Sequence, residues 1–198
     1  MRHLRALVAF WAGAAALGAS GCGYPAAPAA WTQIDRDRPA RAPDVPYEPS
    51  SERAIAAMLE LGQAGPGDVI YDLGCGDGRV VIEAVKRSGG RGVCVDIDPK
   101  LVRQARVNAE RAGVAERIDF RIQDLFATDL RGGNVVMLFL WPEINLRLLP
   151  KLLRELPPGA RIVSNMHDMG KFAPTRVITL EQAQKRPHRV YSWTVPAP

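Results

Sequence analysis

The stretch Asp72-Leu73-Gly74-Cys75-Gly76-Asp77-Gly78-Arg79 decides the fold of this 198-residue chain. It follows a short apolar run, Val69 to Leu73, that is typical of a buried strand, and it precedes a segment, Arg79 to Arg87, that predicts a helix. The glycines let the backbone turn tightly and approach a ligand closely. In open α/β sheets ligands bind beyond the carboxyl ends of the strands, which is where this loop would lie.

The spacing of the glycines separates two kinds of nucleotide cofactor. Sites for NAD and FAD use G-x-G-x-x-G and place a pyrophosphate at the helix N-terminus. This chain has G-x-G-x-G after an acidic residue, Asp72. S-adenosylmethionine (SAM) has no pyrophosphate, and its amino-acid tail needs a carboxylate for the ammonium and backbone donors for the carboxylate. Asp72 can bind the ammonium, Gly74 and Gly76 can lie against the tail, and Gly78 completes the loop.

Strands and helices alternate along the chain, which predicts right-handed crossovers and a parallel sheet. Two late strands have no long helix between them and predict an antiparallel hairpin at one edge. We therefore expect an α/β fold with a Rossmann-like, mostly parallel seven-stranded sheet, an antiparallel edge hairpin and helices on both faces. The strands are expected at 69–73, 92–97, 118–122, 135–140, 160–165, 176–180 and 189–195, and the helices at 54–61, 79–87, 99–112 and 150–156.

Acidic residues follow the second and third predicted strands. Asp96 ends the second strand, where a carboxylate can accept hydrogen bonds from both ribose hydroxyls; a capping or surface acid is the alternative. Asp98, directly before Pro99, suits a helix cap. Asp124 follows the third strand, as a cofactor contact or as a solvated loop acid.

The D-L-G-C-G-D-G pattern between a strand and a helix resembles motif I of class I SAM-dependent methyltransferases. The resemblance covers roughly residues 46–180 and implies SAM as the cofactor. It also implies that Asp124 contacts the adenine amino group.

A narrower resemblance rests on three segments: Val45-Pro46-Tyr47-Glu48-Pro49, Tyr71-Asp72-Leu73-Gly74 and residues 149–156. Together they resemble small bacterial methyltransferases that are similar to the mitochondrial lysine methyltransferases of the ATP synthase c subunit and the adenine nucleotide translocase. That similarity implies a protein lysine as the methyl acceptor, with a membrane protein as one option, and places Tyr47 over the cofactor. The family more commonly has Ser at the position of Cys75.

Candidates for contact with the acceptor follow the fourth and fifth strands. Trp141 can line an amine pocket by a cation–π contact, or it is a core or cover residue. Glu143 can orient an amine, or it is an acid at a helix start. His167 can act as a base, or it is a structural histidine.

The kind of acceptor stays open between three hypotheses. Trp141-Pro142-Glu143-Ile144-Asn145 is not the N/D-P-P-Y/F motif of enzymes that methylate amino groups of nucleic acids, so no nucleic-acid substrate is expected. A small-molecule or lipid methyltransferase and a non-catalytic SAM-fold binding module are the alternatives to a protein-lysine methyltransferase. Metal dependence is not indicated. The net charge of +5 comes from scattered basic residues, which favours a solvated basic surface over an acidic partner.

The N-terminus predicts export. Residues 1–22 have a basic start and an apolar stretch over 6–19, which suits a signal peptide and is too short to span a bilayer. Ala19-Ser20-Gly21-Cys22 resembles a lipoprotein lipobox, with Ala19 in place of the usual leucine, so Cys22 would be lipidated and attach the protein to a membrane. Residues 23–45, rich in Ala and Pro, are a predicted linker, and residues 46–198 are the predicted methyltransferase domain.

We therefore expect an exported, membrane-associated lipoprotein, with a cytoplasmic protein as the alternative. Because SAM is made in the cytoplasm, four explanations stay open: a retained anchor, a different start, SAM that reaches the exported domain, or a fold that has lost its activity. Cys75 and Cys94 are expected to be buried free thiols, since the cysteine spacing indicates neither a disulfide framework nor a metal site.

Overall fold

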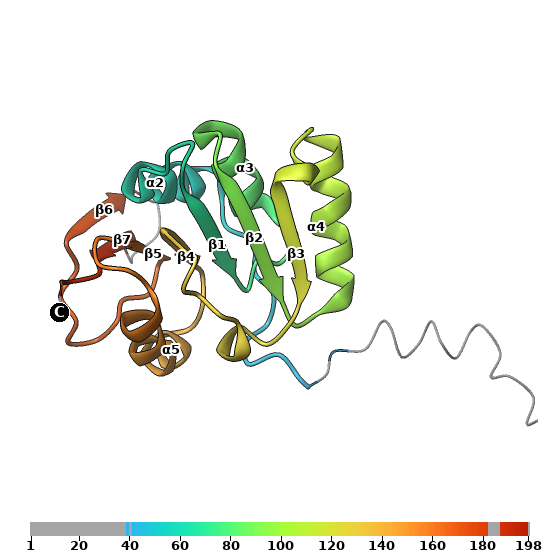
Figure 1. Cartoon of the computed structure of the whole chain (residues 1–198). Helices are drawn as coiled ribbons and strands as arrows, with labels where there is room; N and C mark the ends of the chain where they lie inside the picture. The colour runs from blue at the N-terminus through green and yellow to red at the C-terminus, as the bar shows by residue number, and fades with distance from the viewer. Residues whose placement is uncertain (1–38, 40, 182–186, 198) are drawn as a thin grey trace, which may run out of the picture.

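The computed structural model describes residue 39, residues 41–181 and residues 187–197. The predicted signal peptide, with Cys22, and most of the predicted linker lie outside the described residues. In the described part, one seven-stranded sheet has the strand order β3-β2-β1-β4-β5-β7-β6 (Figure 1). The strands are β1 (Val69–Leu73), β2 (Arg91–Asp96), β3 (Ile118–Ile122), β4 (Val135–Leu138), β5 (Arg161–Asn165), β6 (Arg176–Leu180) and β7 (His188–Thr194).

The first five strands pair in parallel, and β7 pairs antiparallel with both β5 and β6. The predicted edge hairpin is confirmed, and its second strand lies between β5 and β6. The helices are α2 (Glu52–Gly62), α3 (Arg79–Ser88), α4 (Pro99–Arg111) and α5 (Pro142–Glu155), with short 3₁₀ turns η1 (Ala115–Arg117) and η2 (Leu125–Ala127).

Helices cover both faces of the sheet, as predicted. Alternate residues of the central strands point to opposite faces, so each strand contributes to two cores. One core lies under α2, α3 and α4 and includes Ile70, Cys94, Met137 and Val163. The other lies under α5 and includes Leu73, Val95, Leu138 and Ile162.

The predicted start of α5 at Pro150 is wrong. The helix begins at Pro142, which takes the first helical position after Trp141, and Pro150 lies inside the helix. Proline in a helix interior removes a hydrogen bond and disfavours the helix. The buried stripe of Ile144, Leu148 and Leu152 packs against the sheet along the whole helix, and this tertiary packing outweighs the local effect of Pro150.

Gly78 joins the loop after β1 to the helical layer. It precedes α3 with a φ of 79°, and a Cβ placed on it would lie 2.8 Å from Cβ of Ala105 in α4. Any side chain at this position would therefore be strained in its backbone and would also push α4 away from α3. Gly78 is needed for packing, whatever its contact with a cofactor.

We expect Gly78→Ala to lower the free energy of unfolding by about 2–4 kcal/mol, because a left-handed backbone and overpacking each cost at least about 1 kcal/mol. Urea denaturation of the full chain measures this. Gly132→Ala is the matched control, since a Cβ there meets nothing within 4 Å. Equal stability of the two variants would contradict the packing role of Gly78.

Candidate active site

A cavity of about 340 Å³ lies at the carboxyl ends of the central strands. Its walls come from the loop after β1, from the ends of β2 and β4, and from residues 41–50, which we call the N-terminal strap. The strap includes the last residues of the predicted linker, and it runs along the carboxyl ends of the strands (Figure 1). Five of the seven predicted cofactor-binding residues line the cavity: Tyr47, Asp72, Gly74, Asp96 and Asp124.

The glycine loop folds back over β2. Gly74 and Gly76 have positive φ angles of 79° and 54°, and the amides of Gly74 and Cys75 both donate to the carbonyl oxygen of Val95. A Cβ on Gly76 would overlap the ring of Tyr47 in the strap. The absence of a side chain at Gly76 therefore lets Tyr47 lie directly against the loop.

Asp72 is a buried carboxylate at the end of β1, only 4% exposed. Its Oδ2 accepts a hydrogen bond from the amide of Val81, 3.2 Å away. Burial raises the pKa of Asp72 to about 7, because the charged form loses its hydration. A ligand ammonium would restore that charge balance, so the position fits the tail of SAM.

Asp96 holds the other side of the loop. Its two carboxylate oxygens accept hydrogen bonds from the amides of Gly76 and Asp98, each at 2.9 Å. Burial raises the pKa of Asp96, against the effect of these two bonds. Each carboxylate oxygen keeps a further lone pair, so the residue can still accept from a pair of hydroxyls, as expected for a ribose.

Asp124 is held by the strap rather than left open. Its Oδ1 caps the turn η2 through the amide of Phe126, and its Oδ2 accepts from Nε of Arg41, both at 2.9 Å. Burial alone would raise the pKa of Asp124, but the hydrogen bonds from Arg41 and from the amide of Phe126, together with the charge of Arg41, lower it overall. Arg41 also pairs with Asp44 at 2.6 Å. An adenine amino group would share Asp124 with Arg41.

The far end of the strap is anchored beneath β5 and β7. Nδ2 of Asn165 donates to Oγ of Ser50 at 3.1 Å, and Oδ1 of Asn165 lies 2.5 Å from Nε2 of His188. All three residues are buried. The strap is therefore fixed at both ends, by Arg41 on the β3 side and by Ser50 on the β5 side.

None of the three predicted acceptor residues is among those that line the cavity, and they differ in exposure. Trp141 is half exposed at the start of α5, and Glu143 is exposed in the first turn of that helix; neither lines the cavity. His167 is half-buried and stacks on Phe139, with ring centroids 6.4 Å apart. Burial lowers the pKa of His167, so its imidazole is neutral at neutral pH.

Two cavity residues, Phe139 and Glu48, were not assigned a role from the sequence. Phe139 was hidden inside the predicted strand 135–140, which ends at Leu138 instead. Glu48 lies directly after Tyr47 in the segment that carries the narrower resemblance. Its negative charge is the one feature of the sequence that could have indicated a role in binding.

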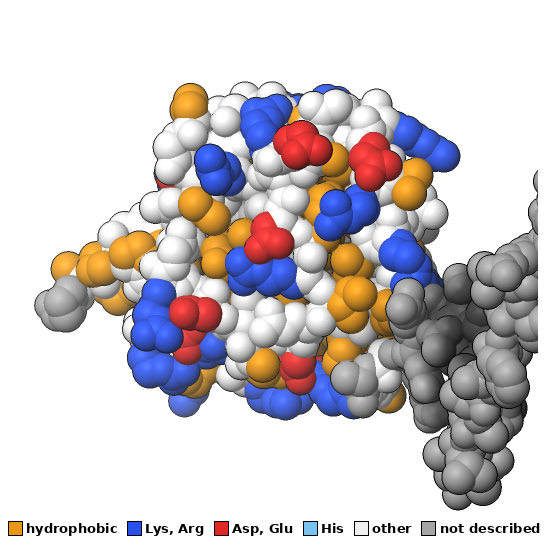
Figure 2. Space-filling view, turned by 45° about the vertical axis from the view of Figure 1, so that its right-hand side comes forward, with side chains coloured by type: hydrophobic (Ala, Val, Ile, Leu, Met, Phe, Trp, Pro, Cys, Tyr) orange, Lys and Arg blue, Asp and Glu red, His pale blue; other side chains and the backbone are white. Residues whose placement is uncertain are grey.

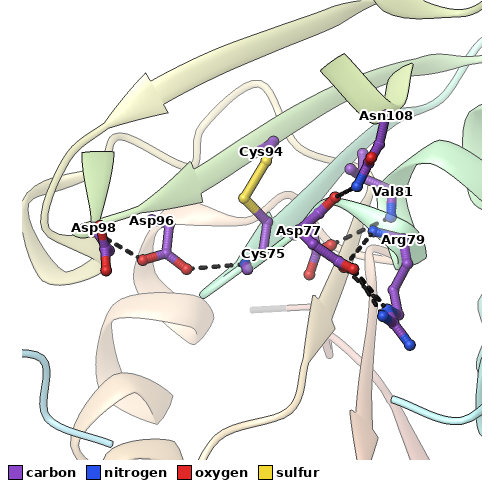
Figure 3. Close-up of a disulfide and its surroundings, with 10 residues drawn as sticks. Cys75, Asp77, Arg79, Val81, Cys94, Asp96, Asp98 and Asn108 are labelled. Atoms are coloured by element: carbon purple, nitrogen blue, oxygen red, sulfur yellow. Dashed lines mark hydrogen bonds and ion pairs between the residues drawn. A yellow bond between two sulfur atoms is a disulfide. The ribbon is translucent and has the colours of Figure 1, made fainter. Parts of the chain in front are cut away.

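Cys75 and Cys94 form a disulfide, so the expectation of two free thiols is wrong (Figure 3). The loop folds back over β2, which brings the two Cα atoms within 5.4 Å although 19 positions separate them in the sequence. That return is a tertiary feature, and the spacing alone did not reveal it. The disulfide ties the cofactor loop to a central strand, with Asp96 on one side and the Asp77–Arg79 ion pair on the other (Figure 3).

Residues 72–176 match the family model described as the ANTKMT methyltransferase domain. The chain belongs to this methyltransferase family. SAM is therefore its cofactor, and the buried Asp72, the glycine loop and Asp96 fit the tail and ribose of that molecule.

Members and relatives of the family carry several descriptions. The chain is 37% identical to the protein-lysine N-methyltransferase of Saccharolobus islandicus, over 77% of this chain and 95% of that protein. It is 36% identical to the adenine nucleotide translocase lysine N-methyltransferase of Mus musculus, over 68% of this chain and 58% of that protein, so it spans little more than half of the mouse enzyme. A crystal structure described as an RNA methyltransferase from Salinibacter ruber, in complex with S-adenosylhomocysteine, is 45% identical and covers 76% of this chain and 95% of its own, with a TM-score of 0.72.

The described residues show neither a metal-binding cluster nor a membrane-spanning helix. No group of three or more His, Cys, Asp or Glu side chains there could hold a metal ion. Within residues 41–181 and 187–197, no helix is both long and apolar enough to cross a membrane.

We expect the affinity for SAM to depend on pH through Asp72. Below about pH 7 its carboxyl is protonated in the free protein and must release the proton to bind an ammonium. The dissociation constant should therefore rise by up to about tenfold per pH unit below pH 7. Asp72→Asn should bind weakly with no such rise, in calorimetric titrations between pH 5.5 and 7.5.

Asp129→Asn is the control for this measurement, because Asp129 pairs with Arg131 at the surface and does not line the cavity. It should behave as the wild type. If the affinity of the wild-type protein for SAM varied with pH no more than that of Asp72→Asn, Asp72 would not be the residue that binds the ammonium.

Proposed function

We propose that this protein transfers a methyl group from SAM to the side-chain amine of a lysine in a protein substrate. The observation that carries the proposal is the β4 end of the cavity, where Phe139 lines the wall and the neutral His167 stacks on its ring. The relative from Saccharolobus islandicus, which this chain covers almost completely, supports lysine as the acceptor.

The chemistry needs a neutral amine. A free lysine has a pKa of about 10.4, so fewer than about one in a thousand are neutral at pH 7. When bound, SAM supplies a methyl group on a positively charged sulfur; the amine lone pair forms the new N–C bond while the electrons of the C–S bond return to sulfur. The lysine ammonium gives up one proton before the transfer, and the neutral His167 can accept it; the product is then a methylated ammonium. The protein contributes mainly alignment, which can be worth several kcal/mol.

RNA is a second candidate acceptor, favoured by the description of the Salinibacter ruber relative. On the face in Figure 2, Lys and Arg side chains are spread with Asp and Glu between them and form no single basic stripe. Phosphate backbones are bound by gathered basic side chains, so this face supports a protein acceptor better.

The deciding experiment offers both acceptors to the full chain with methyl-labelled SAM. We expect label in protein, recovered as methyllysine after digestion, from either the membrane or the soluble fraction of cells. Asp96→Ala should abolish the label, because it removes the carboxylate that holds the cofactor loop. Label in RNA, or label that survives Asp96→Ala, would contradict the proposal.

We also propose that the protein is an exported lipoprotein attached to a membrane through Cys22. The lipobox-like segment and the disulfide support this, because disulfides persist in oxidising compartments and are rare in the cytoplasm. Of the explanations left open by the sequence, this proposal favours an exported domain to which SAM has access.

Export predicts two chemical signatures in intact cells. Cys22→Ser should abolish incorporation of labelled palmitate and move the protein out of the membrane fraction. Cys75 and Cys94 should resist alkylation until a dithiol reductant is added, as read by mass spectrometry. Free thiols at both positions, together with no lipid label on the wild type, would favour a cytoplasmic protein.

A further inference from the structure

Among the residues that the structure describes, seven acidic side chains line the cavity, and six of them have an identified partner or role. Three belong to ion pairs within the cavity wall: Asp77 with Arg79 at 2.7 Å, and both Asp44 and Asp124 with Arg41. These three carboxylates already have a cation beside them, and a positively charged ligand would gain little from them.

Three further acids serve the backbone or the cofactor. Asp98 caps α4 by accepting from the amide of Lys100 at 2.8 Å. Asp72 and Asp96 accept from amides of α3 and the glycine loop, where the tail and ribose of SAM fit. After these assignments a single lining carboxylate is left, that of Glu48.

Glu48 has no hydrogen bond or ion pair among the residues that the structure describes, and it is exposed to solvent. Its neighbour Tyr47 lies against the glycine loop. Burial lowers the pKa of His167 and of His188. On His167 the charges of Asp168, Glu143 and Glu48 oppose that effect, in that order, and on His188 the charge of Glu48 does so. Geometry places Glu48 in the same direction: it lines the cavity between Tyr47 and Ser50, and Ser50 is bonded to Asn165 at the end of β5.

The end of β4 contributes one aromatic side chain to the cavity wall. Phe139 lines the cavity, and its ring is stacked on that of His167, which does not itself line it, with an angle of 22° between the planes. Leu140 and Ile144 continue the lining and are apolar. An alkyl chain can pack along such a wall while a charged end group reaches the carboxylate, the arrangement that long basic side chains adopt at surfaces.

We propose that Glu48 and the stacked pair Phe139–His167 form the subsite for the acceptor amine. The carboxylate of Glu48 binds the incoming ammonium, and the aromatic pair holds the alkyl stem. This subsite rests on the proposed lysine methylation and accounts for the choice of acceptor. The site takes a primary amine on a flexible alkyl chain. A neutral hydroxyl acceptor gains no binding energy from Glu48. Glu48 was not among the residues expected from the sequence to contact the acceptor.

The test uses a binding probe that does not require turnover. Binding of n-butylammonium, which reproduces the end of a lysine side chain, is measured by NMR titration of the full chain saturated with S-adenosylhomocysteine. We expect saturable binding to the wild type and at least about tenfold weaker binding to Glu48→Gln, since a hydrogen bond to a charged group is lost. n-Butanol should bind both proteins equally.

Glu52→Gln is the matched control, because Glu52 is exposed four positions later and does not line the cavity. It should bind n-butylammonium like the wild type. Binding of SAM should stay within about twofold in both variants, which also shows that they are folded. With a lysine acceptor, Glu48→Gln should raise KM about tenfold and leave kcat within a few-fold.

Three results would overturn the subsite: no binding of n-butylammonium to the wild type, equal binding to Glu48→Gln, or a loss of SAM affinity in Glu48→Gln. The last would place Glu48 at the ammonium of the cofactor instead. Failure of lysine methylation with intact, Glu48-dependent amine binding would count against the protein acceptor and leave the amine subsite standing.

Discussion

The turn after β1 needs a left-handed backbone at three glycines, and the rest of the site is built on that turn. A positive φ at Gly74 and Gly76 folds the loop back so that its amides bond to Val95 and Asp96 of β2. The same return leaves room for Tyr47 against Gly76 and for α4 against Gly78. Cofactor loop, strap and helical layer thus meet at one short turn, and a side chain added there disturbs all three.

The strap covers the edge of the sheet beside that turn, and the two together enclose the cavity. It is tied by charge at one end, through Arg41, and by buried neutral hydrogen bonds at the other, through Ser50. Exposed ion pairs hold weakly, whereas buried hydrogen bonds are costly to leave unmade. The β5 end is therefore the firm anchor, and the Arg41 end is the one that salt or a ligand can release.

Much of the fold could be predicted from the sequence because local signals agreed with the tertiary structure. Apolar runs marked the strands, and Ser51 and Asp98 cap helices as their residue types suggest. The start of α5 was missed, because a proline signal at Pro150 is local and the packing that overrides it is not. The cofactor SAM could be predicted from the loop spacing, because the glycines and the adjacent acid are contiguous in the sequence.

The residues on the acceptor side of the site were harder to predict from the sequence. Trp141 and Glu143 follow a strand as substrate residues often do, yet both are exposed at the start of α5 and neither lines the cavity. Glu48 and the partner of Cys75 depend on how segments far apart in the chain fold over one another. No periodicity or spacing encodes such contacts.

The covalent state of Cys75 and Cys94 depends on the compartments through which the protein has passed, and the sequence does not show it. Chains made in a reducing cytoplasm and chains that have passed into an oxidising compartment have the same residues but different covalent structures, and the difference lies inside the cofactor loop. A recombinant preparation from the cytoplasm of a production host can therefore be a mixture of two molecular species. The oxidation state of Cys75 and Cys94 belongs beside purity and concentration in the description of any sample whose affinity for SAM is compared between laboratories.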